Sequence, residues 1–312
     1  FLETAPTDSI SEVAALSSPE NMMLVLNGLH RQMYSSELTG GSGSRHGESY
    51  FIPALDFMSG EVIHTGPGFG WQKSEARWLT HTNPSFTTVF NYWFQRYHFI
   101  ATSNTIINKV ASSDFTVTPE LNNILAQAHA YRAWSYWRLV STYARGYLIG
   151  NPATDPGVPL TDGLGLSDGA PRATVAEVYA QIEADIDAAI GYFADASAPI
   201  NKSHLSLNAA YGIKARVALS KGDWSTAATN AALARDGFPL LNEAGWLQGF
   251  NSVDMSEAIW GSTIIDTETN FFASYFYYIS FMFNGGECRG NNKMINNELW
   301  NSIPDTDFRK PV

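Results

Sequence analysis

Three helical patterns follow one another between residues 119 and 235, and they constrain the fold more than any other part of the chain. They cover residues 119 to 143, 171 to 193 and 208 to 235. In each, apolar residues recur at the three- and four-residue spacing that places them on one face of a helix. The sequence therefore predicts a mostly α-helical protein with little strand.

Capping residues mark where two of these helices begin. Thr118 precedes Pro119, and proline suits the first turn of a helix because the missing N–H is not needed there. Thr174 is followed three residues later by Glu177, the spacing of a capping box. These two starts are the best defined element boundaries in the sequence.

The third pattern divides into two helices around Gly222 and Asp223. Alanines before and after this turn leave room for two antiparallel helices to approach closely. Such a pair is typical of a tetratricopeptide hairpin, so 209 to 235 is predicted to be one. Repeats of this kind bury their apolar faces only by stacking, and further degenerate copies are expected.

The rest of the chain divides into scaffold and loops. A helical-repeat scaffold is predicted over about 18–37 and 85–237, with irregular regions at about 38–84, 144–173 and 238–312. Loops this long within a compact domain are usually either functional or disordered. Shorter elements are expected outside the central region: a helix at about 18 to 34, a helix at about 85 to 112, a strand at 256 to 266 and a helix at about 292 to 302.

Charge and cysteine content exclude several classes. Nineteen basic residues against 30 acidic ones give a formal charge of −11, which argues against a nucleic acid partner. Cys288 is the single cysteine, so no intramolecular disulfide can form. No apolar run approaches the ~20 residues of a membrane-spanning helix.

Catalytic signatures are missing from the sequence. It contains no GxSxG, HExxH or GxxxxGK[ST] motif, and its histidines lack metal-ligand spacing. Most acidic residues fall at predicted helix caps or solvated faces, while Glu61 and Glu75 lie in the long loop, where they could contact a ligand. No enzyme activity, metal site or cofactor is predicted. The acidic residues expected at helix caps or solvated helix faces are Glu177, Glu183, Asp185, Asp187 and Asp223.

Sugar binding requires a different chemistry, an exposed aromatic ring surrounded by hydrogen-bonding side chains. Trp71 and Trp78 lie in the glycine-rich loop, with Glu61, Arg77 and Asn83 nearby. We predict that at least one of the two rings faces solvent and binds a ligand. The alternative is that both tryptophans anchor the loop onto the helices.

A second aromatic wall is predicted at Tyr275, Tyr277 and Tyr278, with Arg289 among its polar neighbours. Alternation along 271 to 279 indicates that some of these rings face inward. The remaining tryptophans considered occupy helix, hairpin or strand positions and are expected in the core: Trp93, Trp134, Trp137, Trp224 and Trp260.

Several short motifs in a fixed order resemble those of one protein family, the SusD/RagB-like nutrient-binding lipoproteins. The resemblance extends along the chain and is strongest from Pro119 to Arg235. It implies a single SusD-like domain over 1–312, truncated at its C-terminus. The motifs are AxAYRAWSYWRLV at 128–140, DPGVPL at 155–160, PRATVAEVY at 171–179, KGDW at 221–224, SEAIWG at 256–261 and PDTDFR at 304–309.

By this resemblance the protein would bind oligosaccharide or polysaccharide at the cell surface without catalysis. It would deliver the glycan to a SusC-like TonB-dependent transporter, and an N-terminal lipid absent from this chain would anchor it to the outer membrane. The alternative is a helical-repeat protein that binds a peptide or protein partner instead of a glycan.

Overall fold

The computed structural model is mostly helical and divides into two compact units. The first comprises Phe1–His30, Arg96–Asn242 and Gln248–Thr263, and the second comprises Arg31–Gln95, Glu243–Leu247 and Ile264–Val312. The structure describes residues 12–35, 38, 47–65, 72–163, 169–250, 252–265, 267, 274–279 and 293–310.

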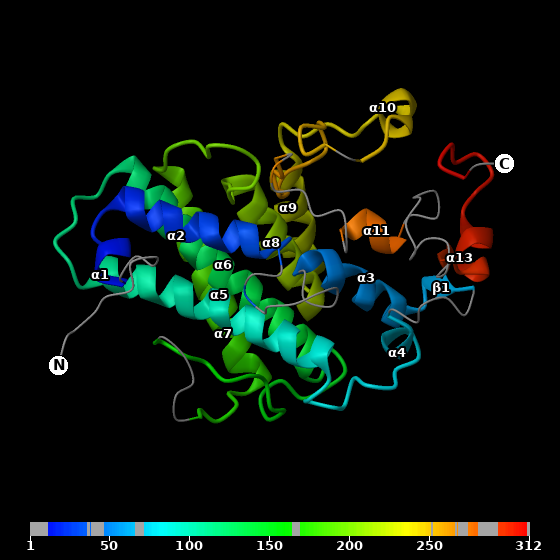
Figure 1. Cartoon of the computed structure of the whole chain (residues 1–312), viewed down its shortest axis with the longest axis horizontal. Helices are drawn as coiled ribbons and strands as arrows, with labels where there is room; N and C mark the ends of the chain where they lie inside the picture. The colour runs from blue at the N-terminus through cyan, green and yellow to red at the C-terminus, as the bar shows by residue number, and fades with distance from the viewer. Residues whose placement is uncertain are drawn as a thin grey trace. The chain divides into compact units, whose positions relative to one another are not determined.

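Long helices build the first unit, which takes in most of α2 and the C-terminal part of α5. Figure 1 shows α6 to α9 running beside one another, and the contacts link α6 to α7, α7 to α8 and α8 to α9. The helices are α1 (Glu12–Ala15), α2 (Pro19–Gln32), α5 (Thr87–Ala111), α6 (Pro119–Tyr143), α7 (Val175–Ala194), α8 (Leu207–Lys221) and α9 (Trp224–Arg235).

The predicted caps are confirmed. The Thr118 side chain accepts a hydrogen bond from the backbone N–H of Leu121 and starts α6. At the start of α7 the Thr174 hydroxyl accepts from the N–H of Glu177, whose carboxylate accepts from the N–H of Thr174 at 2.7 Å. Local sequence therefore fixes both helix starts.

The predicted hairpin is also confirmed. Helix α8 ends at Gly222, whose φ of +76° lies in the left-handed region that glycine adopts without strain. Asp223 then caps α9 by accepting a hydrogen bond from the N–H of Thr226. The two helices pack together along the alanine-rich faces that the sequence shows.

The core of the first unit centres on α6, which buries nearly every side chain along its first five turns. Aromatic rings fill much of it: Tyr131 is completely buried and packs edge-on to Phe99. Trp134 and Trp137 are buried as predicted. A helix buried around most of its circumference is the centre of a helical layer, because partners must cover it on several sides.

Shorter elements make up the second unit together with the first two turns of α5. The strands β1 and β2 pair antiparallel, with Val62 opposite Ile295 and His64 opposite Lys293. The elements are α3 (Glu48–Ser59), β1 (Val62–His64), α4 (Lys73–Ala76), α10 (Glu243–Leu247), α11 (Tyr275–Ile279), β2 (Lys293–Ile295) and α13 (Asn297–Ser302).

The expectation of an irregular segment over 38–84 is wrong where α3 lies. Tyr50, Phe51, Ala54 and Phe57 are all buried, and their spacing gives this helix one apolar face. Pro53 lies inside the helix and removes one backbone hydrogen bond. Burial of four apolar side chains outweighs that loss.

Two further expectations are wrong. The described residues 256 to 265 form no strand; Trp260 Nε1 donates to the Ser203 carbonyl and Gly261 N–H to that of Lys202, without a ladder. Trp224 is 63% exposed, not buried, because it starts α9 at the end of the hairpin, beyond the packed face. Trp93 and Trp260 are half-buried. Among the helices of the described residues, none combines the length and hydropathy needed to cross a membrane.

Candidate functional site

Trp78 presents its ring to solvent in the second unit. Its side chain is 53% exposed, which confirms that one of the two loop tryptophans faces outward. Its φ of +55° places the backbone in the left-handed region, which costs a residue with a Cβ about 1–2 kcal/mol. An observed outlier of this kind often marks a functional position, because the surrounding structure must maintain it.

Hydrogen bonds fix the orientation of this indole. Trp78 Nε1 donates to the carbonyl oxygen of Met58 at 3.1 Å, and the backbone N–H of Trp78 donates to the Glu75 carbonyl at 2.9 Å. The ring also meets His81 edge-on, with centroids 5.1 Å apart. The indole is thus held at one edge while much of its surface stays accessible.

A buried polar cluster holds α4, the short helix before Trp78. The Glu75 carboxylate accepts from the Tyr50 hydroxyl at 2.7 Å and from the Thr88 hydroxyl at 2.6 Å. Burial and the neighbouring Glu75 charge raise the pKa of Tyr50, so it stays protonated and able to donate. Gln72, which also has a positive φ, donates from Nε2 to the Tyr50 carbonyl. Helix α4 is therefore tied to α3 and α5.

The polar residues predicted around the ring have different environments. Glu61, Arg77 and Asn83 are exposed in the same unit as Trp78. The Asn83 side-chain oxygen accepts from the N–H of Ser85 and closes a turn. Glu75 was predicted as a ligand contact, but it is buried and engaged inside the unit. Trp71 lies outside the described residues.

The second predicted wall is not exposed. Tyr277 and Tyr278 are buried, and the Tyr278 ring packs edge-on to Tyr50 at 5.4 Å. Their segment is the helix α11, which packs on α3, so neighbouring rings turn inward together. Tyr275 is half-buried, and Arg289 lies outside the described residues. Tyr277 and Tyr278 thus support the core of the second unit and cannot form a solvent-facing wall.

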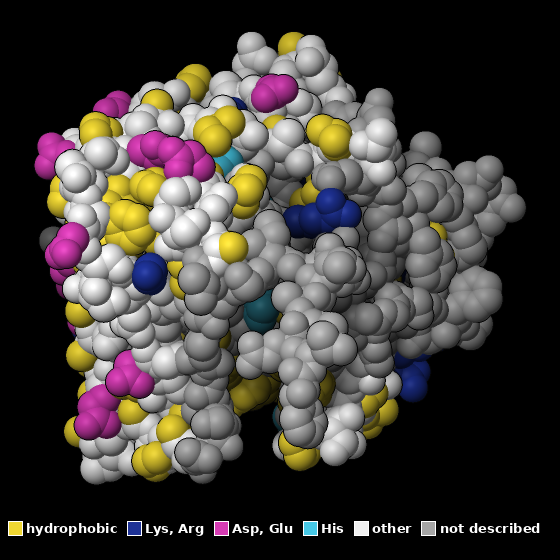
Figure 2. Space-filling view, turned by 60° about the vertical axis from the view of Figure 1, so that its left-hand side comes forward, with side chains coloured by type: hydrophobic (Ala, Val, Ile, Leu, Met, Phe, Trp, Pro, Cys, Tyr) yellow, Lys and Arg dark blue, Asp and Glu magenta, His cyan; other side chains and the backbone are white. Residues whose placement is uncertain are grey.

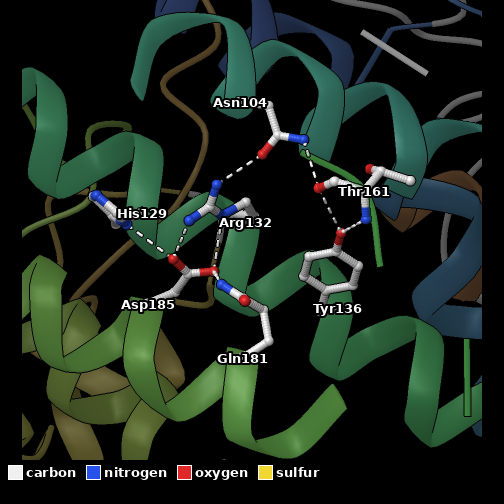
Figure 3. Close-up of polar contacts among 7 residues, drawn as sticks. All are labelled: Asn104, His129, Arg132, Tyr136, Thr161, Gln181 and Asp185. Atoms are coloured by element: carbon white, nitrogen blue, oxygen red, sulfur yellow. Dashed lines mark hydrogen bonds and ion pairs between the residues drawn. The ribbon is translucent and has the colours of Figure 1, made fainter. Parts of the chain in front are cut away.

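A buried ion network in the first unit went unrecognised in the sequence (Figure 3). Arg132 on α6 donates from Nε and Nη2 to both carboxylate oxygens of Asp185 on α7, at 2.8 and 2.5 Å. His129 Nδ1 lies 2.9 Å from the same carboxylate, and Gln181 Nε2 donates to it. Burial acts to raise the pKa of Asp185, but hydrogen bonds from His129 and Arg132 outweigh it and lower this pKa.

The network continues into the loop after α6. Arg132 Nη1 donates to the side-chain oxygen of Asn104 at 2.7 Å, and Asn104 Nδ2 donates to the Thr161 carbonyl at 2.9 Å. The Tyr136 hydroxyl accepts from the Thr161 N–H (Figure 3). The expectation that Asp185 faces solvent is therefore wrong. The signal available in the sequence was a pair of opposite charges, Arg132 and Asp185, each in the middle of a largely apolar helix.

These polar groups are structural and do not form a catalytic pair. Both carboxylate oxygens of Asp185 are already engaged within the scaffold, so this carboxylate is not available to a ligand. Asp305 and Asp307 pair with Lys310 and Arg309. Across the described ranges, no group of three or more His, Cys, Asp or Glu side chains is placed to hold a metal ion. The exposed Trp78 platform is the best candidate site.

Comparison with solved structures identifies the fold. A SusD-like carbohydrate-binding protein from Bacteroides vulgatus superposes with a TM-score of 0.80 at 24% identity, covering 94% of this chain and 60% of that one. A SusD superfamily protein from Bacteroides thetaiotaomicron gives 0.72 at 18% identity, covering 91% and 61%. Surface glycan-binding protein A from Bacteroides fluxus gives a TM-score of 0.67 at 17% identity, covering 94% of this chain and 63% of that one. The chain thus spans about three fifths of the length of these relatives.

A search among curated proteins found no significant match. The family model described as "starch-binding associating with outer membrane" matches residues 61–219, about half of the 312 residues. This segment includes β1, α4, Trp78, the helices α5 to α7 and most of α8, so the family match covers residues of both the candidate site and the helical scaffold. The chain belongs to the SusD-like family.

Proposed function

We propose that this protein binds a glycan through the exposed face of Trp78. The observation that carries the proposal is the half-exposed indole of Trp78, whose Nε1–H donates to the Met58 carbonyl oxygen. The backbone of Trp78 is also held in a strained left-handed conformation. A pyranose has a partly apolar face that an aromatic ring can cover, and Glu61, Arg77 and Asn83 supply polar groups in the same unit. Similar solved proteins are named as carbohydrate- or glycan-binding.

Binding is proposed to serve uptake and not catalysis. The protein would act at the outer surface of the outer membrane, held by an N-terminal lipid, and pass the glycan to a SusC-like TonB-dependent transporter. The family description, starch-binding and associating with the outer membrane, supports this location.

The hairpin offers a surface for a protein partner. Leu219 and Trp224 are both more than half exposed at its turn, and Leu148, equally exposed, lies against Gly222. Exposed apolar side chains gathered at one place favour protein contact. We therefore assign glycan binding to the second unit and transporter contact to the hairpin of the first.

A matched pair of tryptophan variants tests the first assignment. Trp78→Ala and Trp224→Ala each remove one exposed ring, and binding to a panel of polysaccharides is measured by affinity electrophoresis and calorimetry. Trp78→Ala should weaken binding about tenfold or more, since each 1.4 kcal/mol corresponds to a factor of ten, whereas Trp224→Ala should bind normally. Equal binding by both variants would contradict the site.

The second assignment has its own measurement. Trp224→Glu should reduce copurification with a TonB-dependent transporter from the outer membrane while polysaccharide binding is retained. If Trp224→Glu copurifies as wild type does, the hairpin is not the contact surface.

A further inference from the structure

Two cationic residues lie on α4 and at its C-terminal cap, directly before the exposed Trp78 in the chain. Lys73 and Arg77 are four positions apart on α4 and its C-terminal cap, which places them on the same side of one helical turn. Within the described part of the chain neither forms an ion pair with a carboxylate. Like charges at this spacing repel each other, and a bound anion would relieve that repulsion.

The acidic residue between them does not neutralise them at the surface. Glu75 is buried, and its carboxylate is turned toward the Tyr50 and Thr88 hydroxyls. The Glu75 carboxylate therefore accepts hydrogen bonds inside the unit, while Arg77, next to Trp78 in the chain, is exposed. A solvent-facing ligand meets the cations and not this carboxylate.

A third cation approaches from β2. Lys293 pairs opposite His64 and lies over the ring of Phe57, the neighbour of the Met58 carbonyl that holds Trp78. Its ammonium group donates to the Tyr278 carbonyl. Burial, and then the charges of Lys293, Lys73 and Arg77, lower the pKa of His64 to about 4. Three positive charges therefore lie near one imidazole.

This local charge contrasts with the protein as a whole. The formal net charge is −11, and in Figure 2 Asp and Glu side chains gather along one side of the face while Lys and Arg form only small groups. Exposed carboxylates of the same unit include Glu61, Asp56 on α3 and Glu298 on α13. Burial, and then the Asp56 charge, raise the pKa of Tyr275. A net negative protein repels polyanions at long range, so binding of one would depend on a specific local site.

We infer that the ligand stacked on Trp78 is an acidic glycan, whose carboxylate or sulfate group pairs with Lys73 and Arg77. The inference rests on the proposed glycan-binding function. It names the chemical class of the ligand: a sugar with an apolar face and an anionic substituent, not a neutral glucan. Guanidinium and ammonium groups bind either anion through charge-assisted hydrogen bonds.

Matched polysaccharide pairs test the inference in the full chain. Polygalacturonate is compared with its methyl ester, and dextran sulfate with dextran, within a broad array of acidic and neutral glycans read by calorimetry. The acidic member of a pair should bind, and raising the salt concentration should weaken it. The carboxylated and sulfated arms then distinguish the two sources of negative charge.

Charge variants locate the site. Lys73→Gln/Arg77→Gln should weaken binding of the acidic glycan about tenfold. The control Lys109→Gln/Arg145→Gln removes the same charge from the first unit and should bind as wild type does.

The outcomes separate the two proposals. Tight binding of neutral glycans alone, or equal binding by the two double variants, would overturn the acidic ligand and leave glycan binding intact. Failure of every glycan on the array to bind would overturn the proposed function itself.

Discussion

Two turns of this molecule use the same left-handed backbone conformation with different residues. At the end of α8 the residue is Gly222, with a φ of +76°, and glycine adopts this conformation without strain. After α4 the residue is Trp78, with a φ of +55°, and its Cβ makes the same conformation costly. The hairpin thus matches residue to backbone, whereas the α4 turn accepts strain and orients a ring outward.

The comparison separates scaffold from site. Substitutions in the helical scaffold should lower stability without a direct effect on a ligand. Substitutions at the α4 turn should lower ligand binding with little effect on stability. Functional sites commonly retain a strained residue that lowers stability but is needed for function.

The largest effect is expected at Asp185. Asp185→Ala leaves Arg132 buried without its carboxylate and should lower the free energy of unfolding by about 3–5 kcal/mol. Chemical denaturation followed by circular dichroism measures it. Asp187→Ala, two residues on, removes only an exposed pair with Lys214 and should cost less than about 1 kcal/mol. Equal losses in the two variants would mean that the network does not hold the scaffold.

The next effect depends on pH. His30 and His204 are buried in the first unit with ring centroids 4.5 Å apart. Burial, and then the charge of His204, lower the pKa of His30 to about 3, below its usual value near 6.5. Above pH 6.5, His30 is neutral in both the folded and the unfolded protein, and stability does not depend on its titration. As the pH falls from 6.5 toward 3, the unfolded protein binds a proton at His30 that the folded protein does not, so the free energy of unfolding decreases.

Between pH 7 and 4.5 this should lower the free energy of unfolding by about 2 kcal/mol. Denaturation at the two pH values measures the loss, and His30→Leu should reduce the difference. A wild-type protein equally stable at both values would exclude a buried neutral His30.

A smaller effect is expected at the hairpin turn. Gly222→Val forces a β-branched residue into the left-handed region and brings its Cβ to about 2.9 Å from Leu148, so stability should fall by about 1–2 kcal/mol. Gly191→Ala, on α7 with open space around it, should instead raise stability by about 0.5–1 kcal/mol. Thermal melting compares the two; an unchanged melting temperature for Gly222→Val would contradict the role of this turn.

The smallest effect on stability is expected at Trp78. Asparagine tolerates the left-handed region, so Trp78→Asn should change the free energy of unfolding by no more than about 0.5 kcal/mol. Glycan binding should weaken about tenfold or more, as expected for Trp78→Ala. Melting and calorimetry on the same sample measure both. A large loss of stability would show that the ring supports the core and would reverse the comparison.

The same contrast explains what the sequence could predict. The caps at Thr118 and Thr174 and the turn at Gly222 depend on residues within four positions of one another, so local chemistry determined them. Asp185 was misassigned because its burial depends on Arg132, 53 residues earlier, and spacing within one helix does not show that pairing.

Helix α3 was missed because glycine-rich runs lie on both sides of it, at 40–44 and 66–71, although its apolar spacing was present. The sequence predicted that at least one of Trp71 and Trp78 faces solvent, because loops carry exposed rings more often than scaffold helices do, and Trp78 confirms it. The burial of Tyr277 and Tyr278 depends on α11 packing against α3, which the sequence pattern did not reveal.

The hydrogen bond from Trp78 Nε1 to Met58 also limits what the ring can recognise. Because the only polar group of the indole is occupied, the side chain has no donor left for a ligand. Its selectivity must come from shape: a sugar whose C–H bonds form an unbroken patch can lie flat on the ring, while one with an axial hydroxyl in that patch is lifted away. The indole would therefore distinguish epimers by their contour, and the choice among hydroxyl patterns would fall to the side chains around it.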